Sequence, residues 1–600
     1  MSDGEPRDET TPTDPARSTS SSAARPPTAK STPTQTNRRA FLTAAAIGAA
    51  GLGVGAVAGA VGASSAGPRP EPTFPVPTPT DPPGFAHVVV LMGENRSFDN
   101  LLGRLYGPDA PPPREQSFAG LDYGDYTNTA PDGTVIPAQV YAGGTDEIMR
   151  SPDPDPGEEY PHVNTQWFGA VDPDGNENAR VADMREPYNA PPPGTAPTMS
   201  GFVRDYAAVW REAHGRDATT EELARAMGGF TPEMLPVLST LARGFAVYDN
   251  WFAAVPSQTF CNRSFFHAST SHGYVTNQHG GGYRKWLDAP AAPTVFDRLE
   301  EAGLDWRIYF DALSLVSYTG MIHAPALEKY WKTAHFADMA QFERDAADGT
   351  LPAYAFIEPR LVFNHNDFHP PVGQVRRSDV DGSEVYDSAE SDVRAGEALV
   401  ARVYDAIRTS ASATGSNALN TLLLITFDEH GGTYDHVPPP PAVAPDGGGA
   451  GEMGFTFDRL GGRVPAIAVS AYTAAGTVIH DEMHHGSLMA TLSRLHGLEP
   501  LTARDAGAPD LFSAITLDAP RDPSTWPRVH PAWTPPNPEA DPAHPAHANR
   551  DKPLSSPAKG LLGILLAKYD PRAPEPSTFA EAYEVLDTHG RGLFGVGDIP

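Results

Sequence analysis

The feature that most constrains the fold of this chain is a continuous apolar run that is followed directly by acidic residues. Residues 421–427 read TLLLITF, and they are followed at once by Asp428, Glu429, His430 and two glycines. A run of this length and β-branched content is typical of a strand buried on both faces of a parallel sheet. The polar residues then lie at the carboxyl end of that strand, where open α/β sheets bind their ligands. A polar turn that merely terminates the strand is the alternative.

A second stretch, residues 86–100, repeats the arrangement. AHVVVLMG reads as another buried strand, and Glu94 and Asn95 follow it directly. Because parallel strands present their carboxyl ends at one edge of the sheet, we expect both sets of polar side chains to meet there. Carboxylate and amide oxygens suit a divalent cation, whose charge offsets the repulsion between the acids. The two strand ends together predict a metal site.

Strand-like and helix-like segments alternate between residues 85 and 515. Helices are expected at 235–244, 294–303, 396–410 and 485–498, and strands at 245–252, 304–310, 353–359 and 463–470. This alternation predicts an α/β fold with a mostly parallel central sheet flanked by helices. Stretches rich in Pro, Gly and Asp at 104–200 and 372–390 are interpreted as surface insertions. Residues 516–600 form a Pro-rich C-terminal appendage with one amphipathic piece.

The N-terminal residues are predicted to direct export. Residues 1–66 combine a disordered polar region with Arg38-Arg39 and a mild Ala/Gly-rich hydrophobic segment, which is the pattern of a twin-arginine signal peptide. A transmembrane anchor is the alternative, but Ala and Gly contribute little insertion energy. Residues 67–84 form a Pro-rich linker. We therefore expect the twin-arginine translocase as a partner, no stable membrane span in the mature chain, and a secreted or cell-envelope location.

Charge and cysteine content exclude several classes of protein. The formal net charge of −31 argues against a basic nucleic-acid-binding face and provides no long-range attraction to anionic membranes. The chain has one cysteine, Cys261, so no internal disulfide can form.

A hydroxyl group near Cys261 is a candidate nucleophile. Residues 255–269 read VPSQTFCNRSFFHAS and open a predicted helix, with Thr259 and Ser257 at its start. The N-terminus of a helix stabilises negative charge, and its free N–H groups can hold phosphate oxygens. On this evidence an ordinary helix cap remains the alternative for either residue.

Four blocks together resemble the bacterial phosphoesterase family of non-haemolytic phospholipases C and acid phosphatases, within the alkaline phosphatase superfamily. They are HVVVLMGENRSFDNLLG, PSQTFCNR, ITFDEHGGTYDHVPPP and RVPAIAVSAY with MHHGSLM, and they lie in the family's order. The resemblance implies an alkaline phosphatase-like fold. It also implies the following roles: Glu94, Asn95, Asp428 and Glu429 at the metal, Thr259 as nucleophile, and Arg263 and Asn262 in support or in contact with phosphate.

Departures from the family pattern concern Cys261, which stands where proline is expected, and the MHHGS block, where His484 replaces an acid. His369 and His485 match family positions and are predicted to steady phosphoryl oxygens or to protonate the leaving group. His162 is a third candidate for contact with substrate. His430 and His436 are interpreted as braces for the turn after the strand.

These observations predict an exported phosphoesterase that uses one divalent metal ion, with Ca, Mn, Zn and Fe all open. Its expected substrate is a phosphodiester such as a phospholipid, cleaved in the manner of phospholipase C through Thr259. The alternatives are an acid phosphatase that acts on phosphomonoesters and a catalytically inactive cell-surface binding protein on the same scaffold. A sulfatase is disfavoured because its usual maturation motif is missing at TFCNR.

Overall fold

The apolar run at residues 421–427 is strand β13 (Thr421–Phe427), and all seven of its residues are buried. Its neighbour β1 (His87–Gly93) runs parallel to it in register, from His87 opposite Thr421 to Gly93 opposite Phe427. A Cβ on Gly93 would lie 2.6 Å from the Phe427 ring, so only glycine allows this approach of the two strand ends. The residues that follow both strands are therefore placed side by side.

The computed structural model describes residues 84–311, 314–362, 365–371, 378–380, 383–385, 392–445, 447–531 and 553–594. The predicted signal peptide and nearly all of the predicted linker lie outside these ranges, as do parts of the stretch at 372–390. Within the described ranges, no helix has both the length and the hydropathy needed to cross a membrane.

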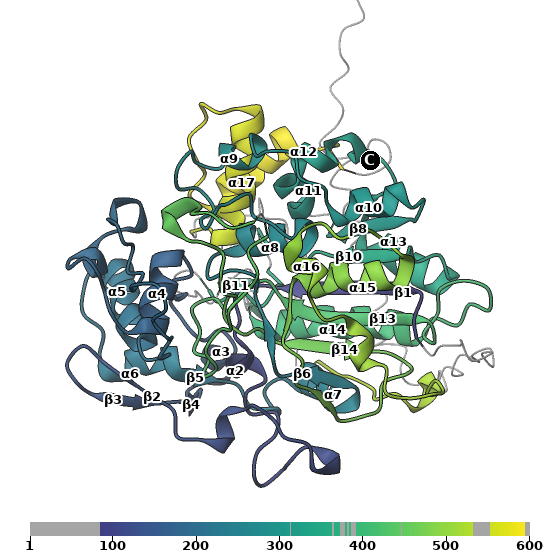
Figure 1. Cartoon of the computed structure of the whole chain (residues 1–600), viewed down its shortest axis with the longest axis horizontal. Coiled ribbons are helices and arrows are strands. Elements are labelled where there is room, and N and C mark those ends of the chain that lie inside the picture. The colour runs from purple at the N-terminus through teal and green to yellow at the C-terminus, as the bar shows by residue number, and fades with distance from the viewer. Residues whose placement is uncertain are drawn as a thin grey trace, which may run out of the picture. The chain divides into compact units, whose positions relative to one another are not determined.

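Eight strands form the main sheet of the described residues (Figure 1). Their order is β15 (Thr477–Ile479), β6 (Ala246–Tyr248), β14 (Ala466–Val469), β13, β1, β10 (Tyr354–Ile357), β8 (Trp306–Phe310) and β9 (Phe336–Asp338). Only β14 runs against the others, being antiparallel to both β13 and β6. The predicted α/β class with a mostly parallel sheet is confirmed. The direction of β14 was not predictable, because a buried apolar run reads the same in either direction.

Helices pack on both faces of this sheet. In β10 and β8, Tyr354 pairs in register with Trp306, and both rings contact Phe296 of α10 (Val295–Glu301). Tyr309 points to the opposite face, where its ring contacts Phe342 of α13 (Met339–Asp348). Helix α8 (Thr259–Ala268) and α15 (Gly486–His496) lie with α10, and α7 (Pro236–Gly244) and α14 (Val393–Arg408) lie with α13.

The stretch 104–200, expected to be a surface insertion, contributes a hydrophobic core of its own. Helix α4 (Tyr160–Phe168) packs against α5 (Phe202–His214), beside the short strands β2 (Thr127–Thr129), β3 (Val135–Pro137), β4 (Gln139–Val140) and β5 (Gly228–Gly229) (Figure 1). Trp167 and Trp210 are buried in this cluster. The Pro- and Asp-rich composition of this stretch masked its few large aromatic residues, each of which buries a large apolar surface.

The piece of the C-terminal segment that was expected to be amphipathic is helix α17 (Ser556–Tyr569), which is instead apolar and buried around most of its surface. It packs on α9 (Arg284–Leu287) and α11 (Tyr318–Ile322). Two glycines allow this packing. A Cβ on Gly560 would lie 2.7 Å from the ring of Phe260, and one on Gly563 would lie 2.0 Å from the ring of Tyr283. Because Phe260 follows Thr259 directly, α17 contacts the helix that carries the predicted nucleophile.

Candidate active site

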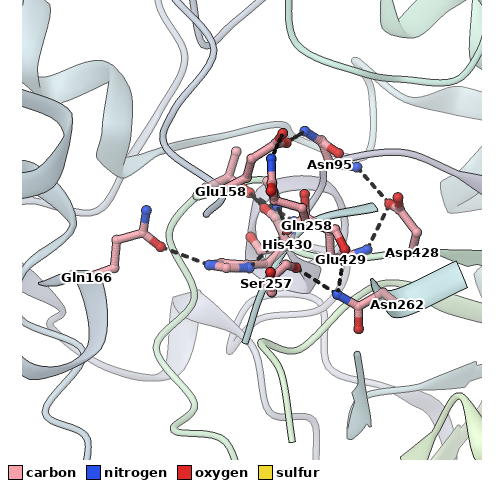
Figure 2. Close-up of polar contacts among 12 residues, drawn as sticks. Asn95, Glu158, Gln166, Ser257, Gln258, Asn262, Asp428, Glu429 and His430 are labelled. Carbon is pink, nitrogen blue, oxygen red and sulfur yellow. Dashed lines mark hydrogen bonds and ion pairs between the residues drawn. The ribbon is translucent and has the colours of Figure 1, made fainter. Parts of the chain in front are cut away.

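The side chains that follow β1 and β13 converge, as the parallel sheet required. The backbone N–H of Asn95 donates to Asp428 Oδ1 at 3.1 Å, although 333 positions separate the two residues. Glu94, Asn95, Asp428 and Glu429 are all fully buried. Figure 2 shows Asn95 between Asp428 and a further acid, Glu158. The four residues predicted to bind metal therefore share one buried location.

The turn after β13 depends on glycine. Gly431 and Gly432 have φ values of 60° and 61°, in the left-handed region. The N–H of Gly431 donates to Glu429 Oε2 at 2.7 Å, which orients that carboxylate. A Cβ on Gly431 would lie 2.2 Å from the backbone oxygen of Asn95.

We expect Gly431→Ala to disturb both strand ends at once. Left-handed strain and the clash with Asn95 together should lower the free energy of unfolding by about 3 kcal/mol. Gly133→Ala is a matched control, because Gly133 also has a positive φ, but a Cβ added there would have no atom within 4 Å. Chemical denaturation of both variants would measure the difference; equal destabilisation would contradict the close contact with Asn95.

Three oxygens of this cluster are buried and have no hydrogen-bond partner among the described residues: Asn95 Oδ1, Asp428 Oδ2 and Glu429 Oε1. Burial raises the pKa of Asp428, and burial followed by the nearby Glu158 carboxylate raises the pKa of Glu429 well above its usual range. Buried carboxylates without partners are costly unless a cation compensates them. Oxygen donors of this kind fit a divalent metal ion.

Thr259 and Arg263 approach Glu94 from the first two turns of α8. Thr259 Oγ1 donates to Glu94 Oε2 at 3.1 Å, and Arg263 Nε donates to Glu94 Oε1 at 2.8 Å. The spacing of four residues places both side chains on one face of the helix. Arg263 Nη1 is buried without a partner among the described residues and can bind an anion. Burial raises the pKa of Glu94 well above its usual range despite the opposing effect of Arg263.

Ser257 and Asn262 have different surroundings. Ser257 Oγ donates to the backbone oxygen of Val275, away from the acids. Asn262 Oδ1 accepts the N–H groups of Ala254 at 2.9 Å and Val255 at 3.0 Å, and its Nδ2 donates to Ser257 O at 2.7 Å. Of the two candidate hydroxyl groups, Thr259 is the one that contacts the strand-end cluster. Asn262, predicted to contact substrate, uses its amide here to hold the loop before α8.

The two histidines predicted to assist catalysis both lie beside the cluster. His485 Nε2 contacts the backbone oxygen of Asp428 at 2.6 Å, and its Nδ1 accepts from Trp251 Nε1 at 3.3 Å, so both ring nitrogens have protein partners. His369 Nδ1 contacts Pro370 O at 2.6 Å, and its Nε2 lies 3.0 Å from Asn95 Nδ2. Burial lowers the pKa of each histidine to about 4, so both rings are neutral near pH 7.

His162 is not brought together with the other predicted residues. Its Nδ1 lies 2.7 Å from Asp205 Oδ1, and it lines a cavity of about 250 Å³ that also includes Arg204 and Arg211. None of the strand-end acids lines this cavity. Burial opposes protonation of His162, but the charge of Asp205 outweighs it and raises the pKa to about 9.

Two acids that the sequence analysis did not single out complete the cluster. Glu158 Oε2 accepts from Asn95 Nδ2, and Glu158 Oε1 accepts from Gln258 Nε2 at 3.2 Å. Asp155 Oδ2 lies 3.7 Å from His369 Nε2. Both acids precede α4 in the sequence PDPDPGEEY. The alternation of acids with proline was the available signal, but it lay in a stretch interpreted as surface.

Comparison with known proteins places this site in a family. The model of the Phosphoesterase family matches residues 85–499. Non-specific phospholipase C6 of Arabidopsis thaliana is 34% identical over 467 residues, covering 74% of this chain and 75% of that protein. Non-specific phospholipase C3 of the same plant is 32% identical over 458 residues, covering 72% and 74%. Phospholipase C B of Mycobacterium tuberculosis is 25% identical over 484 residues, covering 73% and 79%.

Solved structures show a more limited likeness. A protein in the alkaline phosphatase superfamily from Vibrio parahaemolyticus is 12% identical with a TM-score of 0.28, covering 47% of this chain and 65% of that one. The family match spans both strand ends, the start of α8 and the segment of His485. The chain therefore belongs to the Phosphoesterase family and is a hydrolase of ester bonds.

Proposed function

We propose that this protein is a metal-dependent phosphodiesterase of the phospholipase C type that uses Thr259 as its nucleophile. The observation that carries the proposal is the contact of Thr259 Oγ1 with Glu94, 3.1 Å, at the start of a helix that faces buried acids. A threonine hydroxyl is nearly inert at neutral pH and needs a cation or a base to react. Glu94 can act as the base, and the ion proposed below would supply the cation.

One divalent ion would be held by Asn95, Asp428 and Glu429, with Glu94 beside them. The fit rests on the three buried oxygens without hydrogen-bond partners among the described residues, since these are the atoms that a cation would satisfy. When bound, such an ion lowers the proton affinity of a hydroxyl and stabilises charge on phosphoryl oxygens. All of the proposed donors are oxygens, which leaves Ca, Mn, Zn and Fe as candidates.

The protein side chains would perform the remaining steps. Glu94 Oε2 accepts the Thr259 proton, and Thr259 Oγ1 forms a bond to phosphorus as the bond to the leaving alcohol breaks. Arg263 Nη1, which has no partner among the described residues, can bind a phosphoryl oxygen while its Nε stays on Glu94. Glu94 passes that proton to solvent, and the leaving alkoxide takes up one proton from solvent. In the second step water attacks phosphorus as the bond to Thr259 Oγ1 breaks. One proton of the water passes to Oγ1, which restores the hydroxyl and releases a phosphomonoester.

The first substrate class is a phosphodiester, and phospholipid is favoured because the relatives are named phospholipases C. A panel of chromogenic phosphodiesters and phosphomonoesters, with phosphatidylcholine vesicles alongside, would test this assignment with metal analysis of the same sample. Faster turnover of monoesters would favour an acid phosphatase. No turnover of any ester by metal-loaded protein would favour a binding protein on this scaffold.

Export by the twin-arginine pathway is also proposed, from the Arg38-Arg39 pair and the apolar segment after it. Replacing both arginines with lysine should keep the protein in the cytoplasm, because recognition depends on the guanidinium pair. Immunoblots of cytoplasmic and exported fractions would measure the distribution, with Arg17→Lys as a matched control upstream of the signal. Unchanged export of the double variant would reject this route.

A further inference from the structure

A second group of metal-ligating side chains lies beside the strand-end acids. Asp155, Glu158 and His369 each present one donor atom, and these three atoms lie within 4.8 Å of one another. Glu158 and His369 are buried, and the Asp155 side chain is 12% exposed. We call these three residues the second donor group. Two come from the loop before α4 and one from the segment after β10, so the fold brings them together from distant parts of the chain.

His369 is oriented as a ligand. Its Nδ1 lies 2.6 Å from the backbone oxygen of Pro370, which holds the proton on that nitrogen. Its Nε2 then presents a lone pair toward the two acids of the group. A hydrogen bond from one ring nitrogen to a backbone carbonyl is the usual way in which proteins orient a metal-binding histidine. Pro370 therefore leaves a lone pair on the nitrogen that faces Asp155 and Glu158, and a bound cation would replace the 3.0 Å contact of that nitrogen with Asn95 Nδ2.

Unsatisfied oxygens lie in the same place. Asn95 contacts the group through Nδ2, which donates to Glu158 and lies 3.0 Å from His369 Nε2. On the same fully buried amide, Oδ1 has no hydrogen-bond partner among the described residues. Asp155 Oδ1 is also buried without one. Asn95 contacts Asp428 through its backbone N–H and Glu158 of this group through its side-chain amide (Figure 2), so the unpartnered oxygen belongs to a residue that joins the two sets of acids.

Another acidic group of this protein contains an arginine that is ion-paired with its carboxylates, which the second donor group does not. Asp99, Asp435 and His436 also have metal-ligand spacing, but Arg463 lies among them at 2.8 Å from Asp99 and 3.1 Å from Asp435. That guanidinium already compensates the two acids. Among the described residues, no Arg or Lys forms an ion pair with Asp155 or Glu158. Arg96 acts on Asp155 only at longer range, so these two buried carboxylates, which have no ion-paired cationic side chain, would gain from a further positive charge.

We propose that Asp155, Glu158 and His369 bind a second divalent cation, next to the ion held by Asn95, Asp428 and Glu429. One imidazole nitrogen with two carboxylates suits Zn²⁺, Mn²⁺ or Fe²⁺ better than Ca²⁺, which prefers oxygen donors alone. The proposal adds a site to the proposed one-ion centre. It does not depend on which hydroxyl attacks phosphorus.

The test is a count of bound metal ions. The mature protein would be stripped with a chelator, loaded with Mn²⁺, freed of excess and analysed by elemental mass spectrometry. We expect two Mn²⁺ per chain, and one in Glu158→Gln and His369→Gln, because each variant removes a proposed donor to the second ion and leaves every proposed donor to the first ion in the sequence. Glu159→Gln is the matched control: it is the same change at the adjacent residue, whose side chain is 32% exposed, and it should keep two ions.

Circular dichroism would verify that each variant is folded, and Asp428→Asn would report on the first ion. The wild type could instead bind one ion, which Glu158→Gln retains and Asp428→Asn loses. That result would overturn the second site and leave the proposed function standing. One ion that both variants lose would mean a single shared site, which also overturns the inference. Loss of one ion each by Glu158→Gln and Asp428→Asn, from a wild type with two, would support it.

Discussion

Thr259→Ala is expected to lower turnover by a factor on the order of 10³ or more while leaving the fold and the bound metal in place. The hydroxyl is lost, but Glu94 keeps its bond to Arg263, and the proposed metal ligands come from other elements. Steady-state kinetics with the best chromogenic ester would measure the loss. Metal analysis and circular dichroism of the same sample would show whether the site and the fold survive.

Two further variants make this result specific. Thr259→Ser keeps the hydroxyl and should retain part of the activity. Ser257→Ala is the matched control, because that hydroxyl points to Val275 O rather than to the acids. Rapid acid quench followed by peptide mapping should place phosphate on Thr259. Phosphate on Ser257, or turnover near that of the wild type in Thr259→Ala, would show that another nucleophile attacks.

Asp428→Ala is expected to abolish metal binding at the strand ends and, with it, activity. Asp428 Oδ2 has no hydrogen-bond partner among the described residues and lies 3.7 Å from Arg263 Nε, and Asp428 Oδ1 accepts the N–H groups of Asn95 at 3.1 Å and Glu429 at 2.8 Å. The substitution therefore removes a proposed ligand and also loosens two others. Asp428→Asn keeps the acceptor for both N–H groups and removes only the charge, so it separates ligation from positioning.

Asp435→Asn is the matched control for Asp428, because it lies in the same loop and its charge is compensated by Arg463 rather than by a metal. We expect it to destabilise the protein without changing the metal content. Elemental analysis and thermal unfolding would be measured on all three variants. Full metal content in Asp428→Ala would remove this residue from the proposed centre, as would equal loss of metal in Asp435→Asn.

Much of the site could be predicted from the pattern of apolar runs. Two such runs that are buried on both faces are typical of a mostly parallel sheet, and where the two strands run parallel the residues after them share one edge. Glu94 and Asp428 follow two strands that are neighbours in the sheet and run parallel, so these two acids are placed side by side. The start of α8 was also predictable, since the helix begins at the residue that the motif placed first, Thr259.

The roles of individual polar atoms were not predictable in this way. Ser257 and Thr259 differ by two positions in one loop, and only packing decides that one hydroxyl meets Glu94 and the other a backbone oxygen. The same holds for His162. It follows Glu158 by only four residues in the sequence, but it belongs to α4 and lines a different cavity. Short-range sequence cannot distinguish these outcomes, because each depends on partners that are remote in the chain.

Asp155 and Glu158 mark the boundary most clearly. The sequence alone determined the central sheet, the edge at which the strand-end acids meet and the helix that begins at Thr259. It left the loop of Asp155 and Glu158 among the surface segments, because no apolar periodicity surrounds them. The loop reaches the site because α4 and α5 bury Trp167 and Trp210 in a core of their own, which anchors the residues before α4. Long-range packing of a few large side chains therefore decided which acids join the strand ends, and local patterns do not record such contacts.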